Sequence, residues 1–353
     1  MKFMARALAA ALIAAAGAAA ATEVPSTMSI MRETYRGWPG TYRLATDALE
    51  VRIATAVGPR IVDLRAAGGE NLLYVRDAEI GRSGEPEWMF RGGWRLWIAP
   101  ERRASTYELD NAPCAAEVID GRVVRVTGPP QPIAGIQKVV ELEACADAPC
   151  LRVRSRIRNI GAAPVTYAAW SLSVMRPGGR AFAPLDVGPL EDFDATRKLI
   201  LWSYTELADP RYQFGDRLAQ VEHARVRPGP AGQQGRRDDE SKIAVDSSQG
   251  WAAYLLGRTL YLKRFPHAPD AQYPDGGATI EIYSNAEFLE LENLSPLTTI
   301  APGGELAYPE DWWVFTEVDI PADEAGALRA LESYVDRAPA QFGEDPAGTP
   351  ARP

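Results

Sequence analysis

The sequence has 353 residues, with 38 Lys or Arg against 47 Asp or Glu and only 2 His, which gives a formal net charge of −9 at pH 7. An acidic chain without a basic tract is poorly suited to nucleic acid or to an anionic membrane surface, so we expect neither as a partner. The 9 Trp and 13 Tyr residues are more informative. Aromatic rings stack on the apolar C–H face of a sugar, although core packing absorbs most aromatic side chains in any protein.

The N-terminal segment has the features of an export signal. Lys2 and Arg6 form a short basic start, Ala7–Ala20 is apolar, and the small residues around Ala19–Ala21 suit a cleavage site. We therefore predict a signal peptide over residues 1–21 and a periplasmic or secreted protein. No later segment approaches the roughly 18 apolar residues that a membrane span requires, so we expect no span.

Short alternating runs separated by Gly, Pro and Asp follow, and they predict an antiparallel all-β sandwich. In one of these runs, Leu151–Asn159, apolar residues alternate with arginines, which predicts one apolar and one basic face. Helix–strand alternation is not visible, which argues against α/β folds. The predicted strands are Leu49–Ala54, Arg60–Leu64, Val118–Val126, Gln137–Glu143, Leu151–Asn159, Val165–Val174, Trp251–Leu256, Thr259–Lys263, Thr279–Ser284 and Glu287–Leu291.

No break in composition divides these strands into two domains. Val226–Lys242, with its Pro, Gly and alternating charges, is predicted to be a surface loop inside one domain. Near the C-terminus Leu328, Leu331 and Val335 share one helical stripe. The predicted organisation is a β-sandwich domain over residues 32–320, a C-terminal helix over residues 321–338 and a disordered tail over residues 339–353.

Three cysteines fit an oxidising compartment. Cys145 and Cys150 bracket the turn between two predicted strands, which is typical of a hairpin that a disulfide can close. Pairing of Cys114 with either of them stays open at this stage. The two histidines lie far from the cysteines in the sequence, and no acidic loop has the spacing of a calcium motif, so we predict neither a metal nor a cofactor.

The segment from Met89 to Asn111 is the densest in side chains suited to binding. Period two places Arg95 and Trp97 on one side of a strand, with Trp94, Leu96 and Ile98 on the other. An Arg beside a Trp offers fixed donors for hydroxyl groups and a ring for the C–H face of a sugar. In the alternative interpretation the Trp residues are core and Arg95 pairs with Glu101. Further polar candidates for the rim of a site are Glu101, Tyr107, Asp110 and Asn111.

A second segment, Lys263–Pro296, carries repeated acids. Period two places Glu281 and Tyr283 on one face of a strand, and Glu290 and Glu292 on one face of the next. Carboxylates at this spacing repel each other, and this repulsion raises a carboxyl pKa towards the range useful for acid or base catalysis. The alternative is a solvated edge balanced by nearby cations.

Two further candidates come from isolated residues. Trp170 lies in the predicted strand Val165–Val174, and a loop with Trp202 and Tyr204 follows it. His267, between Pro266 and Pro269, is a candidate acid or base, although a lone histidine in a loop is more often inert. Signatures of serine hydrolases, zinc proteases, kinases and dehydrogenases are missing from the sequence.

Several of these residues together resemble a known group of proteins. The matching stretches are Gly92–Trp97 with Pro100 and Glu101, Tyr107–Asn111, Tyr283–Pro296, Pro302–Gly304 and Trp312. They are similar to an uncharacterised bacterial family grouped with the galactose mutarotase-like superfamily. The resemblance extends over about Tyr35–Val318. It implies a β-supersandwich whose concave face binds sugars, as in aldose 1-epimerases, some glycosidases and some polysaccharide lyases.

The resemblance also implies roles for individual residues. Aldose 1-epimerases use a histidine acid, a late carboxylate base and an Arg that holds the sugar. By resemblance Arg95 matches the Arg, and Glu290 or Glu292 matches the base. The strand expected to carry the histidine has Trp170 and no histidine. Either His267 or another acid takes that role, or the protein does not epimerise sugars.

The sequence therefore predicts an exported carbohydrate-binding protein, with aldose 1-epimerase-like isomerase activity as one possibility. The alternatives are a hydrolase or lyase that uses paired acids, and a non-catalytic envelope or partner-binding protein. The last alternative predicts that Arg95 and the glutamates are paired and buried without an open cleft. The candidate catalytic residues are Glu292, Glu290 and His267, and the candidate binding residues are Arg95, Trp97, Glu101, Tyr107, Asn111, Trp170, Glu281 and Tyr283.

Overall fold

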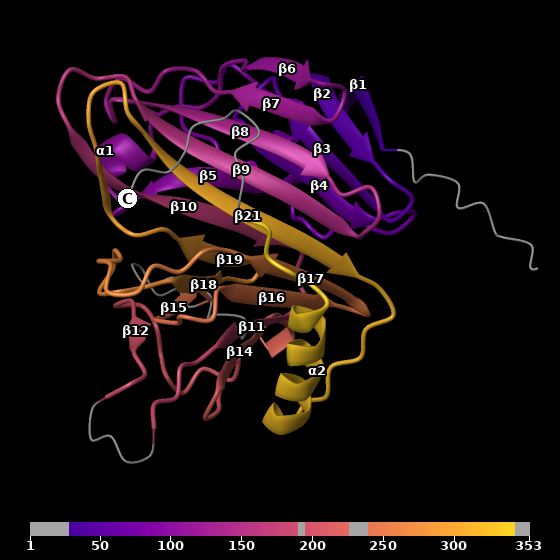
Figure 1. The fold of residues 1–353 in the computed structure, drawn as a ribbon, viewed down its shortest axis with the longest axis vertical. Helices are drawn as coiled ribbons and strands as arrows, with labels where there is room; N and C mark the ends of the chain where they lie inside the picture. Colours follow the sequence, from indigo (N-terminus) through magenta and orange to yellow (C-terminus); the bar gives the residue numbers. More distant parts are fainter. Residues whose placement is uncertain (1–27, 190–194, 226–238, 343–353) are drawn as a thin grey trace, which may run out of the picture.

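The fold consists of two large antiparallel β-sheets, one of 11 strands and one of 10, with a helix near the C-terminus (Figure 1). The computed structural model describes residues 28–189, 195–225 and 239–342. The predicted signal peptide, most of the predicted loop Val226–Lys242 and residues 343–353 lie outside this part of the chain. The all-β sandwich predicted from the alternating runs is confirmed.

The larger sheet has the order β1-β2-β3-β4-β5-β10-β19-β18-β15-β12, and β20 pairs with β10 outside this path. Neighbours along the path are antiparallel, as hairpin-connected strands usually are. Its strands are β1 (Ser29–Tyr35), β2 (Trp38–Ala45), β3 (Leu49–Ala54), β4 (Arg60–Ala66), β5 (Trp94–Ala99), β10 (Val165–Met175), β12 (Leu199–Leu201), β15 (Ser241–Val245), β18 (Ile280–Ser284), β19 (Leu289–Leu294) and β20 (Thr298–Ile300).

The smaller sheet has the order β13-β14-β11-β16-β17-β21-β9-β8-β7-β6, and its long strands β8, β9 and β21 lie side by side in Figure 1. Its strands are β6 (Ala115–Ile119), β7 (Val123–Thr127), β8 (Ile136–Ala144), β9 (Cys150–Asn159), β11 (Arg180–Pro184), β13 (Tyr212–Phe214), β14 (Leu218–Glu222), β16 (Trp251–Leu256), β17 (Thr259–Arg264) and β21 (Glu305–Phe315). The helical segments are η1 (Asp77–Glu79), α1 (Arg103–Thr106), η2 (His223–Arg225) and α2 (Glu324–Asp336).

The main core lies between the two sheets and is built by period-two alternation. On β5 the side chains of Trp94, Leu96 and Ile98 enter this core, as the sequence pattern predicts. The same core contains the side chains of Ile280 and Ile282 on β18 and of Leu289 and Leu291 on β19. Each of these strands therefore leaves its alternate residues on the outer face of the larger sheet.

The helix α2 covers a second, smaller core on the outer side of the smaller sheet. Ala327 and Leu331 pack there with Leu218 of β14 and Trp251 of β16. The helix begins after Asp323, whose side chain accepts a hydrogen bond from the Gly326 amide, as expected of an N-cap. Its bounds lie within the predicted helix 321–338.

Three local features differ from the sequence predictions. The predicted single strand Val118–Val126 is a hairpin, because Asp120 and Gly121 adopt positive φ angles of 49° and 68° and reverse the chain. The first sheet residue is Ser29 rather than residue 32. Gln341, in the predicted disordered tail, is held by its backbone, since its amide donates to Asp311 over 2.5 Å.

The cysteine hairpin is present, but its cysteines are free thiols. The Cys145 amide donates to the Cys150 carbonyl over 2.8 Å, so the two residues face each other at the end of the β8–β9 hairpin. The disulfide that this hairpin could accommodate is not formed in this structure, and Cys114 is also a free thiol. Burial raises the pKa of the Cys114 thiol to about 12.

None of the helices in the described residues is long and apolar enough to cross a membrane.

Two consecutive glycines hold the start of β5 against its neighbours. Gly92 and Gly93 have φ angles of 80° and 72°, and a Cβ on Gly93 would lie 2.3 Å from the Ile61 carbonyl oxygen. A Cβ on Gly92 would lie equally close, at 2.3 Å, to the Tyr74 carbonyl oxygen. Only glycine allows so close an approach of two backbone segments, and this approach fixes the loop that precedes β5.

We predict that Gly93→Ala destabilises the protein by at least about 3 kcal/mol, because the free-energy cost of the left-handed backbone conformation adds to the cost of the collision with a carbonyl oxygen. Gly121→Ala is the matched control, since Gly121 has a φ of 68° but no atom within 4 Å of an added Cβ. The control should cost only about 1 kcal/mol, from backbone strain alone. Urea unfolding midpoints of both variants test this, and equal losses would contradict the collision argument.

Candidate functional site

The outer face of the larger sheet brings together the side chains that the sequence singles out. Its strands pair so that residues from distant segments form rows across the sheet. One row joins Trp97, Trp170 and Leu294. The next row joins Arg95, Leu172, Glu292 and Glu281. A third row joins Glu290, Tyr283 and Lys242.

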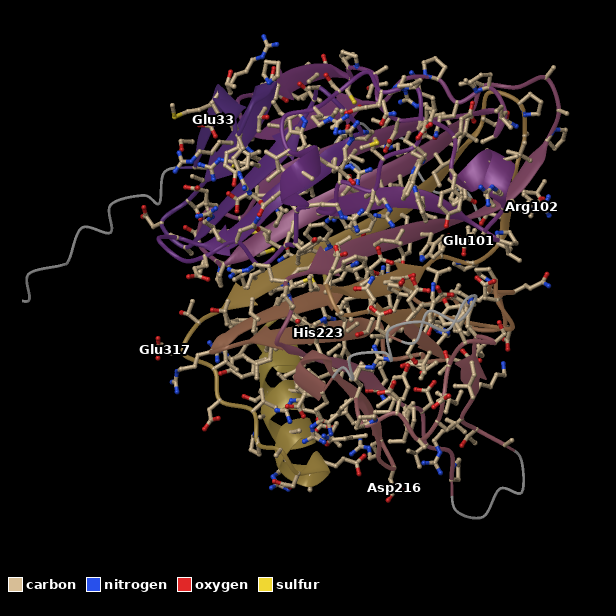
Figure 2. The ribbon with its side chains drawn as sticks, turned by 180° about the vertical axis from the view of Figure 1, so that it is seen from behind. Glu33, Glu101, Arg102, Asp216, His223 and Glu317 are labelled. Carbon is tan, nitrogen blue, oxygen red and sulfur yellow. The ribbon has the colours of Figure 1, made fainter. Side chains whose placement is uncertain are left out.

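A cavity of about 570 Å³ lies on this face. It is of the size that proteins use for small-molecule ligands, about 300–1,000 Å³. Its lining combines aromatic rings with charged groups, and comprises Arg76, Trp88, Phe90, Arg95, Trp97, Glu101, Tyr107, Trp170, Leu172, Trp202, Tyr204, Glu240, Lys242, Tyr283, Asn285, Phe288 and Glu290. Figure 2 shows Glu101 and Arg102 near α1, at one side of the molecule.

An ion pair between Arg95 and Glu290 occupies the middle of this lining. Arg95 Nη2 lies 3.0 Å from Glu290 Oε1, and both side chains are almost fully buried. The guanidinium carbon lies 4.1 Å from the centre of the Trp97 ring, within range of a cation–π contact. The alternative pairing of Arg95 with Glu101 is not found, because Glu101 instead accepts a 2.5 Å hydrogen bond from the Tyr107 hydroxyl.

Glu290 is the carboxyl group best suited to proton transfer at neutral pH. Burial raises its pKa, the charge of Arg95 opposes the increase, and the charge of Glu292 adds to it, so the pKa of Glu290 is about 7. A carboxyl group with this pKa is present in both protonation states near neutrality. Because it lines the cavity, Glu290 can exchange a proton with a bound ligand.

A second buried charge cluster is centred on Lys242, which lines the cavity, while its two carboxylate partners lie outside the lining. Its Nζ lies 2.6 Å from Glu281 Oε2 and 3.0 Å from Glu292 Oε2. The same ammonium lies 4.7 Å from the ring centres of both Trp170 and Trp202. Burial disfavours the ammonium, but the two carboxylates outweigh it and hold the pKa of Lys242 well above its ordinary value. Lys242 therefore stays cationic.

The two acids beside Lys242 differ from Glu290 in their access to the cavity. Glu281 and Glu292 are fully buried, and neither is among the residues that line the cavity. Glu292 also accepts a 2.7 Å hydrogen bond from the Trp170 indole. Burial raises the pKa of Glu281 well above its ordinary value, against the opposing charge of Lys242. Both acids are thus connected to the cavity only through Lys242 and Trp170.

Besides Glu281 and Glu292, two further predicted site residues are not part of the cavity lining. Asn111 is buried, and its amide donates to the carbonyl oxygens of Glu85 and Glu87, which makes it a support for the loop before β5. His267 stacks on Tyr273 with ring centres 5.5 Å apart. The other histidine, His223, lies near the middle of the molecule in Figure 2 and accepts a hydrogen bond from the Gly178 amide.

The predicted residues that do line the cavity are Arg95, Trp97, Glu101, Tyr107, Trp170, Tyr283 and Glu290. Lining residues that the sequence did not single out include Arg76, Trp88, Phe90 and Lys242. Lys242 lies at the end of the predicted loop Val226–Lys242 but belongs to β15, whose short run Ser-Lys-Ile-Ala-Val shows no polar–apolar alternation that would predict a strand. Trp88 and Phe90 lie two residues apart just before Gly92. This spacing places both rings on one side of an extended segment, but the adjacent Arg95–Trp97 pattern was the clearer feature of the sequence.

Solved structures with the same architecture share little sequence with this chain. A "putative aldose 1-epimerase" from Klebsiella pneumoniae subsp. pneumoniae matches with a TM-score of 0.56 and 12% identity, over 91% of each chain. A galactose mutarotase-like protein from Clostridium acetobutylicum matches with a TM-score of 0.51 and 11% identity, over 82% of this chain and 99% of the other. The chain has the galactose mutarotase-like fold. No family model and no curated protein sequence matches it.

The mutarotase-like fold expected from the sequence resemblance is thereby confirmed. At this level of identity the similarity establishes the fold alone, and a shared fold does not transfer an activity. The chemistry must therefore come from the side chains of this chain. In the residues that the structure describes, no group of three or more His, Cys, Asp or Glu side chains is arranged to hold a metal ion.

We predict that Lys242→Met destabilises the protein by about 3–5 kcal/mol, because it leaves buried carboxyl groups without their cation. Glu281, whose pKa is already raised, then has a still higher pKa in the folded than in the unfolded chain. Its protonation favours folding, so the variant should be most stable at acidic pH and lose stability as the pH rises.

Lys198→Met is the matched control, since Lys198 lies 2.7 Å from Asp246 but its side chain is 60% exposed. This exposed pair should contribute no more than about 1 kcal/mol. Urea unfolding at pH 5 and pH 8 measures both effects. An equal loss in the two variants would show that the buried cluster is not stabilised by Lys242.

Proposed function

We propose that this protein is exported and binds a carbohydrate in the cavity on the outer face of the larger sheet. The observation that carries the proposal is the lining itself, which combines aromatic rings from several segments with buried, oriented charges. A sugar ring presents apolar C–H faces and a rim of hydroxyl groups. Aromatic rings match its faces, and Arg, Lys and Glu side chains match its rim.

Unused hydrogen-bond donors support the same proposal. Arg95 Nε and Nη1 and the Trp88 indole nitrogen are buried and have no hydrogen-bond partner among the described residues. Arg95 and Trp88 lie together, with 5.9 Å between the guanidinium carbon and the ring centre. Unpaired buried donors are costly, so they favour a ligand that supplies oxygen acceptors.

The non-catalytic partner-binding alternative predicts paired, buried charges and no open cleft. Arg95 and Glu290 are indeed paired and buried, but they border a cavity of about 570 Å³. Such a cavity favours a small ligand over a flat protein interface.

We predict that Trp202→Ala lowers sugar affinity by about tenfold or more, because the ring forms part of the wall and shields Lys242. Phe214→Ala is the control, since Phe214 is 40% exposed on β13 of the smaller sheet. Saturation-transfer NMR with monosaccharides, uronic acids and oligosaccharides measures binding. Absence of saturation transfer to every sugar would contradict the proposed function.

A second candidate function, aldose 1-epimerase-like isomerisation, is favoured by one observation: Glu290 lines the cavity and has a pKa of about 7. Exchange of anomers requires a base to remove the proton from the anomeric hydroxyl, cleavage of the bond between C1 and the ring oxygen, and a proton for that oxygen. Glu290 is suited to be the base. Lys242, kept cationic and lining the cavity, can stabilise the ring oxygen as it gains negative charge. A water molecule then protonates that oxygen, and Glu290 returns its proton to the hydroxide that is left.

We predict that any anomer exchange catalysed by the protein falls at least about 100-fold in Glu290→Gln, because the amide cannot accept the proton. In the wild type the rate should rise as the pH passes through about 7, where the basic form of Glu290 becomes dominant. Glu317→Gln is the control, since Glu317 is exposed and pairs with Arg258, and neither residue lines the cavity.

Exchange between anomeric signals in proton NMR gives the rate for each variant. If sugars bind but the wild type does not accelerate exchange, the isomerase candidate fails and the binding function remains.

A further inference from the structure

Two cysteines face each other at the turn end of the β8–β9 hairpin, in the smaller sheet. The sheet register pairs Ala144 with Leu151, so that Cys145 lies opposite Cys150. Residues opposite each other in an antiparallel pair have Cα atoms about 4.5–5.5 Å apart, within the range of about 4.4–6.8 Å that a disulfide spans. The two thiols are also hydrogen-bonded to each other. The pair can therefore pass between dithiol and disulfide without rearrangement of the sheet.

The two thiols differ in environment. Cys150 is 3% exposed and packs among the apolar side chains of the smaller core, whereas Cys145 is half-buried. The hydrogen bond with Cys150 lowers the pKa of Cys145, and the charge of Arg152 acts in the same direction against the effect of burial. The hydrogen bond with Cys145 and burial both raise the pKa of Cys150. Because the thiolate is the nucleophile, Cys145 is suited to attack and Cys150 is not.

Both cysteines line a cavity of about 590 Å³, here the thiol cavity, which shares no lining residue with the cavity on the larger sheet. Its volume lies in the range of about 300–1,000 Å³ that small-molecule ligands occupy. Trp313 forms part of its wall, is 7% exposed, and has an indole nitrogen without a hydrogen-bond partner among the described residues. A buried donor without a partner favours a ligand that brings an acceptor.

The lining of the thiol cavity has no net charge. Its two cations are Arg122 and Arg152, and its two acids are Glu143 and Asp147. Both arginines already pair with Glu143, over 2.6 Å and 3.2 Å. A lining balanced in this way suits a neutral or zwitterionic ligand better than one with a net charge.

The hairpin does not depend on a covalent bond between these cysteines. The strands β8 and β9 pair along their whole length, from Ile136 with Asn159 to Ala144 with Leu151. A disulfide at this place closes only the short turn between Cys145 and Cys150, and a short loop gives the smallest gain in stability. Because Cys145 is also reachable from the thiol cavity, this bond is of the labile kind rather than a structural one.

We propose that Cys145 and Cys150 form a reversible dithiol–disulfide couple that exchanges with small neutral or zwitterionic disulfides bound in the thiol cavity. The Cys145 thiolate attacks one sulfur of the substrate R–S–S–R, the S–S bond breaks, and one R–S⁻ leaves with the electron pair. Cys150 then loses its proton and attacks the Cys145 sulfur of the mixed disulfide, which releases the second R–S⁻. The protein is oxidised, the substrate is reduced, and the two cysteine protons end on the two released thiols. This activity is separate from the proposed carbohydrate binding.

The test uses the full chain, reduced with dithiothreitol under native conditions, freed of the reductant and kept without oxygen in the presence of a chelator. Hydroxyethyl disulfide and cystine are the probes. The intact mass should fall by two hydrogen atoms as two small thiols are released for each chain. Fresh dithiothreitol should restore the original mass while the circular dichroism spectrum stays unchanged.

Single variants separate the roles of the cysteines. Cys150→Ser keeps a hydrogen-bond donor beside Cys145 but cannot resolve the mixed disulfide, so it should accumulate one R–S group on Cys145. Cys145→Ser should react at least about tenfold more slowly, because the remaining thiol is buried and protonated. Cys114→Ser is the matched control and should leave the exchange unchanged, since Cys114 lies outside the thiol cavity and burial raises its pKa to about 12.

The dependence of the rate on disulfide concentration tests the thiol cavity itself. A substrate bound beside Cys145 gives a rate that saturates. Trp313→Phe keeps an aromatic ring and removes the unpaired donor, so the half-saturating concentration should rise by a few-fold with the maximal rate unchanged.

Each contrary result has a definite meaning. If no hydrogen is lost, or if the oxidised form is reduced only after unfolding, the reversible couple is overturned. Equal adduct formation in Cys150→Ser and Cys145→Ser overturns the assignment of the attacking thiol. A rate that stays linear in disulfide concentration overturns binding in the thiol cavity.

Discussion

One buried positive charge organises the cavity floor. Lys242 joins two glutamates and two tryptophans that belong to different strands or loops. Removing such a charge from water costs several kcal/mol, and the cost is offset only when the partners are placed accurately. The pairing of β15, β18 and β19 is therefore coupled to the geometry of the site, because a register shift in any of them would separate Lys242 from Glu281 or Glu292.

The need to compensate buried charge also separates the three glutamates of β18 and β19 into two kinds. Glu281 and Glu292 compensate Lys242 and are closed off from the cavity, whereas Glu290 pairs with Arg95 at the lining. Three glutamates on two adjacent strands would repel one another without these two cations. In the structure Lys242 compensates the buried pair Glu281 and Glu292, and Arg95 compensates Glu290 at the lining. Of the three acids, Glu290 is the one with a pKa of about 7.

Period-two alternation allowed much of this arrangement to be predicted from the sequence. It placed Arg95 and Trp97 opposite the core residues of β5, and Glu290 opposite Leu289 and Leu291. Alternation is local, however, and gives no information about which strands become neighbours. The partners of Arg95 and Lys242 depend on sheet order and register, and Arg95 and Glu290 are 195 residues apart in the chain. For this reason the sequence suggested Glu101 as the partner of Arg95 and left Lys242 in a loop.

The smaller sheet shows why a basic pattern in the sequence does not by itself define a binding surface. The arginines of β9 form one face of the strand, as predicted, but acids on the neighbouring strands neutralise them. Arg154 lies 3.0 Å from Asp311 of β21, and Arg156 lies 3.0 Å from Glu141 of β8. The row of positive charge predicted from one strand is thus a ladder of ion pairs in the folded sheet.

The paired glycines before β5 limit how the cavity can be remodelled. Gly92 and Gly93 fit against backbone carbonyl groups so closely that neither accepts a side chain. Trp88 and Phe90 stand only a few residues ahead of them, so the loop that carries both rings has a fixed end. Remodelling this loop by insertion or by a bulkier residue at the glycines would disturb the sheet itself. Evolution and protein engineering are therefore left with a narrower route to a cavity of different shape: exchange of the side chains at positions 88 and 90 on an unchanged backbone.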